Sequence, residues 1–507
     1  MRNSPKELII YEENKPKVLH ALKDGRIDYI ALTKWEFIDR FFAFLVSAGF
    51  FKWCGCTYPT PRKKKEVAAW FLYSCGIQMK LHTETAFDNL PGILQSGSIL
   101  TRVKFNAGLK DGGFNYKNKK PRTTAADHDT VRKYYKDTDP DKLENWYNKD
   151  VVGWMRRHRG FDKEGIFILD MSLLPVPDNP NYKRTGYLPL DEEGNFIDIS
   201  GLTEEEKSKV KYRRCYGFTS LLHISKEADY FLYAGTHLGA GSASALKAGE
   251  KLVDGFVGNF GKRIIKWLIA DRGFIDGGMI SRFKKDYYID TLIPLKSNMD
   301  VFTDALGIAS SKEVKWQLYY EGKDYEGKFI REEITAVEEL KTWDSCDIAV
   351  HAALMRKKDA KGKIIHQWGL ASTRPFNNPA QAFDLYHKRT QIEERHKQLK
   401  LCWLLYKFTS PEFSLIMMHV VFTILVYSLI QMYLVRKQLQ ELANKTINSL
   451  RQQERLGKDA VIVYAKKNFA TFNVDEYSDI LLNLEGPPKK RLARWVKEFK
   501  SRKIRAP

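Results

Sequence analysis

The stretch RIIKWLIAD, residues 263–271, is a short apolar run that predicts a buried β-strand, and it ends on the carboxylate of Asp271. A second run of the same type, GIFILD at 165–170, ends on Asp170. At the carboxyl edge of a buried sheet, side chains leave the core and meet solvent. The two aspartates are therefore candidates for one polar site, although each could also be an ordinary turn or cap residue.

Further predicted strands and helices surround these two runs. Strands are predicted at 216–225, 229–239 and 287–296, and helices at 245–260 and 276–286. Strands followed by alternating helix and strand predict a mixed α/β sheet with helices on its faces.

At 507 residues the chain is too long for one ordinary domain. We expect a multidomain α/β protein with these parts: a helical N-terminal region at 1–125, a helical linker at 126–164, an α/β core at 165–296 and 373–410, a β-rich insertion at 297–372 and a helical C-terminal region at 411–507.

The charge of the chain favours a polyanionic partner. Lys and Arg number 83 against 62 Asp and Glu, a formal net charge of +21. Each basic residue that meets a phosphate releases a condensed counterion, so nucleic acid is the first explanation. The basic segments are at 61–65, 110–129 and 489–505. The alternatives are a charge that only prevents association and, for the tail, a solvated amphipathic helix. No helix-turn-helix is convincing, so base-specific recognition is not predicted.

The cysteines do not indicate a disulfide framework, since no CxxC pair occurs. Cys54, Cys56, Cys75 and His82 could be imagined as a zinc site, but CxC is poor spacing and reduced thiols are the better interpretation. The N-terminus shows no secretory signal, so a cytoplasmic protein is expected.

The stretch Leu415 to Val435 has transmembrane length and no charged residue. It contains four polar residues, His419, Thr423, Ser428 and Gln431. A buried helix of a large soluble protein explains this pattern better, and no membrane partner is expected.

A third acid stands on a predicted long helix that carries AFDLYHKRTQIEERHKQLKL, residues 382–401. Helical periodicity places four of its residues on one face: Tyr386, Arg389, Glu393 and Lys400. Glu394 lies about 100° away and Asp384 on roughly the opposite side, so the geometry selects Glu393. The other interpretation is a solvated helix with charge pairs at i,i+4.

The spacing Tyr386-x2-Arg389-x3-Glu393-x6-Lys400 resembles the Y-R-E-K signature of bacterial insertion-sequence transposases with a DDE catalytic core. ADRGF at 270–274 resembles their second-Asp motif, and GIFILD resembles the strand that carries the first Asp. The β-rich segment is similar to the insertion of that group. The resemblance covers about 165–410, roughly half of the chain.

One departure concerns the first acid. The group often follows it with a polar residue and then Thr or Ser, whereas Asp170 is followed by Met171, Ser172 and Leu173. Its rival is Asp178 in PVPDNPN, whose surroundings are typical of a turn.

The resemblance implies an RNase H-like core and cut-and-paste transposition. Asp170, Asp271 and Glu393 would be the catalytic residues and would hold two Mg²⁺ ions per active site, with Mn²⁺ as a substitute. Hydrolysis of a phosphodiester at the element's end would free a 3′-OH, which then joins target DNA, with a hairpin intermediate in related transposases. The implied partners are double-stranded DNA, as element ends and target, and a second copy in a homodimer on paired ends.

The remaining implied roles concern DNA contacts. Phosphates near the scissile bond would be bound by Tyr386, Arg389, Lys400 and Arg272. A hairpin requires a base to leave the stack, and the candidate aromatic residues are Trp316, Trp343 and Trp368. Two alternatives stay open: a metal-dependent nuclease of the same fold without strand transfer, and an inactive transposase-derived DNA-binding protein.

Overall fold

The computed structural model describes residues 12–33, 36–61, 69–90, 128–192, 194–199, 201–225, 230–324, 326–453 and 460–484, with the isolated positions 93, 116–117, 120–121, 486, 490 and 493. The chain divides into two compact units. Unit 1 comprises Met1–Trp146 and Leu401–Pro507, and unit 2 comprises Tyr147–Lys400. Of the predicted basic segments at 61–65, 110–129 and 489–505, all but a few residues lie outside the described residues.

Unit 2 is built on a large mixed sheet. Its central strands are β5 (Ile166–Pro175), β7 (Tyr212–Ile224), β8 (Phe231–Ala240), β9 (Trp267–Ala270) and β10 (Asp290–Pro294). Their order in the sheet is β8-β7-β5-β9-β10. The pairs β8–β7 and β7–β5 are antiparallel, and the pairs β5–β9 and β9–β10 are parallel. The five strands predicted for the core are thereby confirmed.

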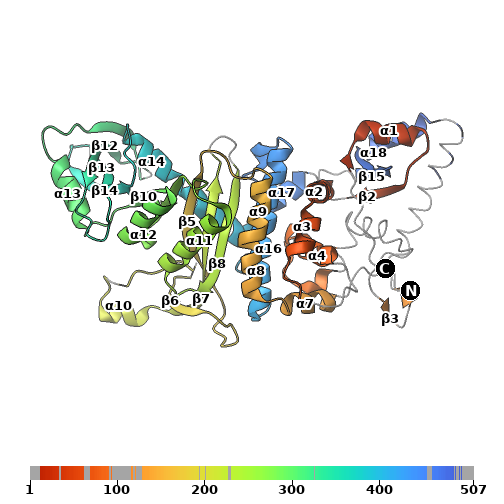
Figure 1. The fold of residues 1–507 in the computed structure, drawn as a ribbon, viewed down its shortest axis with the longest axis horizontal. Coiled ribbons are helices and arrows are strands. Elements are labelled where there is room, and N and C mark those ends of the chain that lie inside the picture. The colour runs from red at the N-terminus through yellow and green to blue at the C-terminus, as the bar shows by residue number, and fades with distance from the viewer. Residues whose placement is uncertain are drawn as a thin grey trace. The chain divides into compact units, whose positions relative to one another are not determined.

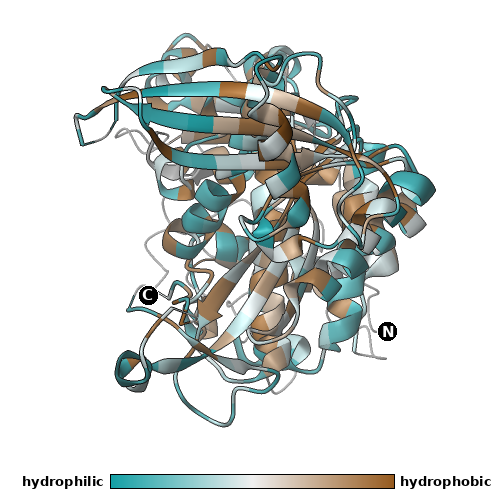
Figure 2. Ribbon diagram, turned by 90° about the vertical axis from the view of Figure 1, so that its left-hand side faces the viewer, coloured by the Kyte–Doolittle hydropathy of each residue, from teal (hydrophilic) through white to brown (hydrophobic). Residues whose placement is uncertain are grey.

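The sheet continues beyond β10 through strands that lie between Asp271 and Glu393 in sequence. They are β14 (Ile364–Ser372), β13 (Val350–Asp359), β12 (Phe329–Leu340) and β11 (Gln317–Lys323), all antiparallel. The strands of this sheet carry both hydrophilic and hydrophobic stretches (Figure 2), and in β13 the first six residues are buried whereas the last four are partly exposed. The segment is not purely β, because α13 (Asp300–Ala309) precedes β11 and packs against β12 and β13.

Unit 2 also contains a further strand and several helical elements. They are the π-helix η2 (Tyr147–Val151), α9 (Val152–Arg157), β6 (Gly186–Pro189), α10 (Glu204–Lys209), α11 (Ala245–Phe260), η3 (Arg272–Phe274), α12 (Gly277–Arg282), η4 (Phe283–Tyr287), α14 (Ala380–His387) and α15 (Thr390–Cys402). Helix α11, predicted at 245–260, packs on β5, β7 and β8 (Figure 1).

Unit 1 contains most of the helices expected at the two ends of the chain. They are α1 (Lys15–Lys23), α2 (Glu36–Ser47), α3 (Phe50–Thr57), α4 (Ala69–Leu81), η1 (Phe87–Asn89), α7 (His128–Lys136), α8 (Pro140–Trp146), α16 (Phe413–Arg436), η5 (Gln440–Leu442), α17 (Ile447–Gln453) and α18 (Val474–Leu482).

Unit 1 also contains strands that the sequence analysis missed. Its four-stranded sheet has the order β1 (Glu12–Glu13), β16 (Asn468–Asn473), β15 (Ala460–Ala465) and β2 (Tyr29–Thr33), and a small hairpin joins β3 (Tyr116–Lys117) and β4 (Lys120–Pro121). Tyr29 pairs with Tyr464, more than 400 residues away. No local pattern reveals a partner at that distance.

Helix α16 has the length and hydropathy of a membrane span, and its most apolar stretch is 94% buried. Its polar side chains find partners inside unit 1. Thr423 Oγ1 donates to the His419 carbonyl at 2.6 Å, and Gln431 Nε2 donates to the Ala443 carbonyl at 2.8 Å. This is the pattern of a helix in a protein core.

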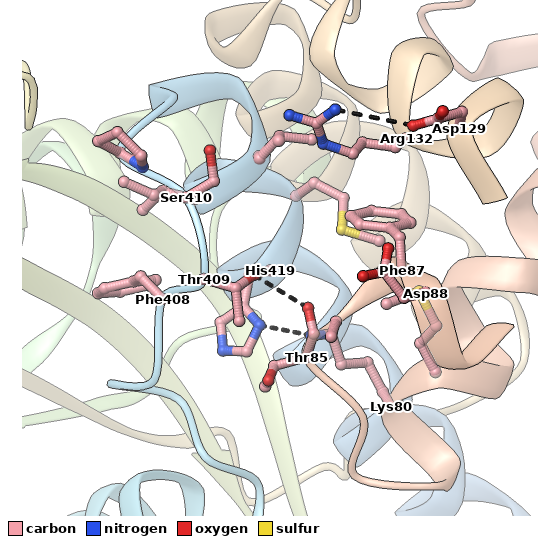
Figure 3. A pocket seen from close by; sticks show the side chains of 16 residues that line it. Lys80, Thr85, Phe87, Asp88, Asp129, Arg132, Phe408, Thr409, Ser410 and His419 are labelled. Atoms are coloured by element: carbon pink, nitrogen blue, oxygen red, sulfur yellow. Dashed lines mark hydrogen bonds and ion pairs between the residues drawn. The ribbon is translucent and has the colours of Figure 1, made fainter.

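A buried lysine–histidine pair links α4 to α16. Lys80 and His419 are 3% and 7% exposed, and Lys80 Nζ lies 2.5 Å from His419 Nδ1. His419 Nε2 donates to the Leu404 carbonyl at 3.0 Å, which leaves Nδ1 as the acceptor for Lys80. The pair lines a pocket of about 440 Å³, shown in Figure 3. Burial lowers the pKa of Lys80 to about 7.

The Lys80 amine makes the stability of the protein depend on pH. The pKa of lysine in an unfolded chain is about 10.4, so between pH 7 and 10 the unfolded chain binds more protons than the folded one. Stability is then lost as pH falls through this window, by about 2 kcal/mol between pH 9 and pH 7. We expect Lys80→Met to remove this dependence, as measured by chemical denaturation at both pH values. Lys133→Met, at an exposed position of α7, should keep the wild-type dependence; identical pH profiles for all three proteins would contradict the prediction.

Two glycines of α11 give a second prediction. A Cβ on Gly249 would lie 2.7 Å from Leu169 Cδ2 and 2.7 Å from Phe274 Cε1, whereas a Cβ on Gly255 meets nothing within 4 Å. Gly249→Ala should lower the free energy of unfolding by about 1–3 kcal/mol through overpacking. Gly255→Ala should raise it by about 0.5–1 kcal/mol, because alanine favours the helix. Thermal and chemical denaturation measure the stability of the two variants. If Gly249→Ala and Gly255→Ala were equally stable, the close packing at Gly249 would be refuted.

Candidate active site

The parallel pairing of β5 with β9 brings two aspartates together. Its register runs from Ile166 opposite Trp267 to Leu169 opposite Ala270. Asp170 and Asp271 are the residues that directly follow this last pair, and neighbouring strands lie about 4.8 Å apart. Because the strands run in the same direction, both carboxylates stand at the same edge of this pairing.

The prediction that Asp170 ends its strand is wrong. Strand β5 continues to Pro175, because its other neighbour, β7, stays paired with it as far as Cys215. Only the pairing with β9 stops at Leu169. Asp170 is therefore held within a strand and is 7% exposed.

Asp271 directly follows β9, as predicted, and starts the 3-10 turn η3. Its Oδ1 accepts a hydrogen bond from the Gly273 amide at 2.7 Å. A Cβ on Gly273 would stand 3.0 Å from that oxygen, so the glycine permits this close approach. Burial, and next the neighbouring Asp170 carboxylate, raise the pKa of Asp271. The two acids therefore sense each other's charge.

Glu393 lies in the first turn of α15, and its setting differs from the prediction in one respect. The expected single helix over 382–401 is two helices, since the chain turns at Lys388 and Arg389. There the Arg389 amide donates a hydrogen bond to the Tyr386 carbonyl at 2.8 Å. This bond joins residues three apart in sequence, so the turn is tighter than that of an α-helix, whose bonds join residues four apart. Tyr386 therefore stands on α14 and Glu393 on α15, so these two residues do not share the face of one helix.

The signature residues nevertheless meet around Arg389. Its guanidinium lies 2.5 Å from Glu393 Oε1 and 5.7 Å from the centre of the Tyr386 ring. Burial alone would lower the pKa of Arg389, but Tyr386, Glu393 and the two aspartates together raise it. Arg389 is thus the counter-charge of all three acids.

Two further cationic side chains, Lys400 and Arg272, lie near these acids and Tyr386. Burial lowers the pKa of Lys400, an effect that the Asp170 carboxylate opposes. Arg272 is exposed and acts electrostatically on Tyr386. The structure therefore brings together three acids and the four predicted DNA-contact residues.

The donor chemistry of the three acids suits a hard divalent cation. Carboxylate oxygens are the ligands that Mg²⁺ and Mn²⁺ prefer, and the like charges here repel one another in partial burial. The three acids do not form a preformed metal-binding site. Among the described residues, no group of three His, Cys, Asp or Glu side chains is arranged to hold a metal ion. Glu393 is instead paired with Arg389.

The same finding covers the zinc alternative. Cys54 and Cys75 are buried and Cys56 is exposed, and within the described part of the chain these thiols form no metal-binding group with His82.

The rival acids lie in other surroundings. Asp178 is exposed, accepts a hydrogen bond from Tyr187 and lies 3.3 Å from Arg214 Nε. Glu394 accepts from Gln398 at 3.4 Å. After burial, it is the carboxylates of Asp170 and Glu393 that raise the pKa of Asp271.

The three candidate tryptophans all take part in packing. Trp316 Nε1 donates to the Ala309 carbonyl at 3.1 Å, and Trp343 is buried. Trp368 packs against Phe383 and lies 6.1 Å from Tyr386 between ring centres, so it alone of the three contacts a signature residue.

His396 and Ser220 were missed from the sequence. His396 Nδ1 lies 3.3 Å from Asp170 Oδ2, and Ser220 Oγ lies 2.9 Å from His396 Nε2. The spacing of three between Glu393 and His396 was an available signal, because residues at i and i+3 share a helix face. The role of Ser220 depends on strand pairing and leaves no mark in the sequence.

Comparison with known families agrees with this constellation. The sequence model of the Transposase DDE domain matches residues 161–429, which is 269 of 507 residues and includes Asp170, Asp271 and Glu393. No curated protein matches the chain. The chain therefore belongs to the transposase family that is defined by the DDE domain.

Proposed function

We propose that this protein cleaves the ends of a transposable element by two-metal-ion phosphodiester hydrolysis and joins the freed 3′-OH ends to target DNA. The observation that carries the proposal is the register of β5 and β9, which puts Asp170 beside Asp271. The electrostatic coupling of Asp271 to Asp170 and Glu393 adds the third acid. The strand order β8-β7-β5-β9-β10 supports an RNase H-like core, with β11–β14 as its insertion.

In this proposal Asp170, Asp271 and Glu393 hold two Mg²⁺ ions, with Mn²⁺ as a substitute. When bound, the ions would activate the attacking oxygen and stabilise the leaving oxygen. The chain's own residues orient the DNA. Arg389 and Lys400 bind phosphates by charge, Tyr386 by hydrogen bonding, and Arg272 extends the cationic surface.

For Glu393 to bind a cation, its pairing with Arg389 has to be exchanged. Arg389 lies 2.5 Å from Glu393 Oε1 and is also influenced by both aspartates. A DNA phosphate near the site would offer the guanidinium a bidentate partner. We infer that Arg389 passes from the acids to DNA as the complex assembles.

The partners follow from the reaction. Joining two ends calls for a homodimer on paired element ends. The net charge of +21 favours binding to DNA, which is a polyanion. A second-strand hairpin would need an extruded base, and Trp368 is the candidate that contacts Tyr386. The N-terminal region and the basic tail would bind the ends, in the cytoplasm.

The first test replaces individual acids. Asp271→Asn and Glu393→Gln should each lower Mg²⁺-dependent cleavage by about 100- to 1,000-fold, the equivalent of about 3–4 kcal/mol of transition-state stabilisation. DNA binding, measured by electrophoretic mobility shift, should persist because no positive charge is lost. Glu394→Gln is the matched control and should cleave like the wild type. Unimpaired cleavage by Glu393→Gln would refute the assignment.

The second test separates a transposase from a nuclease of the same fold. A pre-cut element end with a free 3′-OH bypasses hydrolysis, and incubation with target DNA and Mg²⁺ should give joined products. Cleavage of intact ends without joining would establish the nuclease instead. Binding without either reaction would identify an inactive, transposase-derived DNA-binding protein.

A further inference from the structure

A buried histidine ring connects the helix that carries Glu393 to the strand that carries Asp170. His396 is one helical turn after Glu393 on α15 and is 4% exposed. Its Nδ1 lies 3.3 Å from Asp170 Oδ2, and its Nε2 lies 2.9 Å from Ser220 Oγ. One ring therefore reaches α15, β5 and β7.

The strand register explains why one ring can reach both side chains. Asp170 and Ser220 are directly opposite each other in the antiparallel pairing of β5 and β7. Opposite residues point to the same face of a sheet, with Cβ atoms about 5 Å apart. The His396 ring also packs edge-on against Phe218 at 5.4 Å and parallel to Tyr233 at 6.3 Å between ring centres. These contacts limit its rotation.

The two contacts of the ring differ in kind. His396 Nδ1 and Asp170 Oδ2 form an ion-pair contact at 3.3 Å, whereas Ser220 Oγ lies within hydrogen-bond distance of His396 Nε2 at 2.9 Å. A ring N–H on the Asp170 side leaves Nε2 to accept a hydrogen bond from the Ser220 hydroxyl. A histidine that is oriented in this way can fix the carboxylate, as outer-shell partners of metal ligands do in other sites.

We propose that His396 is a positioning residue that fixes the orientation of the Asp170 carboxylate and, through α15, the separation of Asp170 from Glu393. The inference rests on the proposed function, in which those acids bind the divalent ions. Asp170 is 7% exposed, so it cannot adjust freely once its strand and this ring are set. His396 itself touches neither the ions nor the DNA in this scheme.

Direct titration with Mn²⁺ tests the proposal apart from catalysis. His396→Phe keeps the ring and its aromatic packing but loses both nitrogens, and we expect Mn²⁺ affinity to fall 10- to 100-fold in calorimetric titration. His396→Asn restores an N–H donor on the Asp170 side and should recover most of the affinity. In cleavage assays His396→Phe should need more Mn²⁺ for half-maximal rate, while its rate at saturating Mn²⁺ stays near that of the wild type.

The matched control is another buried histidine–aspartate contact of the same sheet. His223 Nε2 lies 3.2 Å from Asp162 Oδ1, and the His223 side chain is fully buried. His223→Phe should lower thermal stability and leave the Mn²⁺ affinity of the folded protein unchanged. If both phenylalanine variants lose affinity equally, the effect is general loosening of the sheet and the proposal is overturned.

Asp271→Asn separates a failure of this inference from a failure of the proposed function. If Asp271→Asn binds Mn²⁺ like the wild type, the metal site itself is misassigned. If Asp271→Asn loses binding but His396→Phe retains it, only the positioning role is overturned. Should His396→Phe not fold, Ser220→Ala replaces it: a smaller loss of Mn²⁺ affinity is expected, and an unchanged affinity overturns the role.

Discussion

The parallel pairing of β5 with β9 is the constraint on which the candidate active site depends. It places the last paired residues, Leu169 and Ala270, opposite each other, so that Asp170 and Asp271 follow side by side. Two neighbouring carboxylates repel each other, and burial, followed by the Asp170 charge, raises the pKa of Asp271. The backbone hydrogen bonds of the sheet hold together what electrostatics alone would separate.

The surrounding elements each contribute to offsetting this repulsion. The turn of η3 gives Asp271 an amide donor, and the break between α14 and α15 places the Arg389 guanidinium among the acids. His396 brings an imidazole to Asp170 from the same helix as Glu393. A divalent cation would take over much of this compensation, which is why the donor set suits Mg²⁺ or Mn²⁺.

The positions of the two aspartates also depend on the close packing of α11 against β5 and η3. A Cβ on Gly249 of α11 would lie 2.7 Å from side-chain atoms of Leu169 and Phe274, which stand one residue before Asp170 and three residues after Asp271. The helix can approach β5 and η3 this closely only because the glycine has no side chain. The positions of the acids therefore depend on a residue with no chemical function of its own.

The sequence by itself determined the five core strands, helix α11, the buried character of α16 and the identity of the candidate acids. These follow from local patterns: apolar runs, helical periodicity and a signature spacing. Only the tertiary structure decided what depends on distant partners. Strand β5 continues beyond Asp170 because β7 stays paired with it. Strand β2 pairs with β15, which lies more than 400 residues away in sequence. Likewise Tyr386 and Glu393 both contact Arg389 across a helix break, and Ser220 reaches His396 through strand pairing. Such contacts arise from pairing and packing between segments, which no single stretch of sequence encodes.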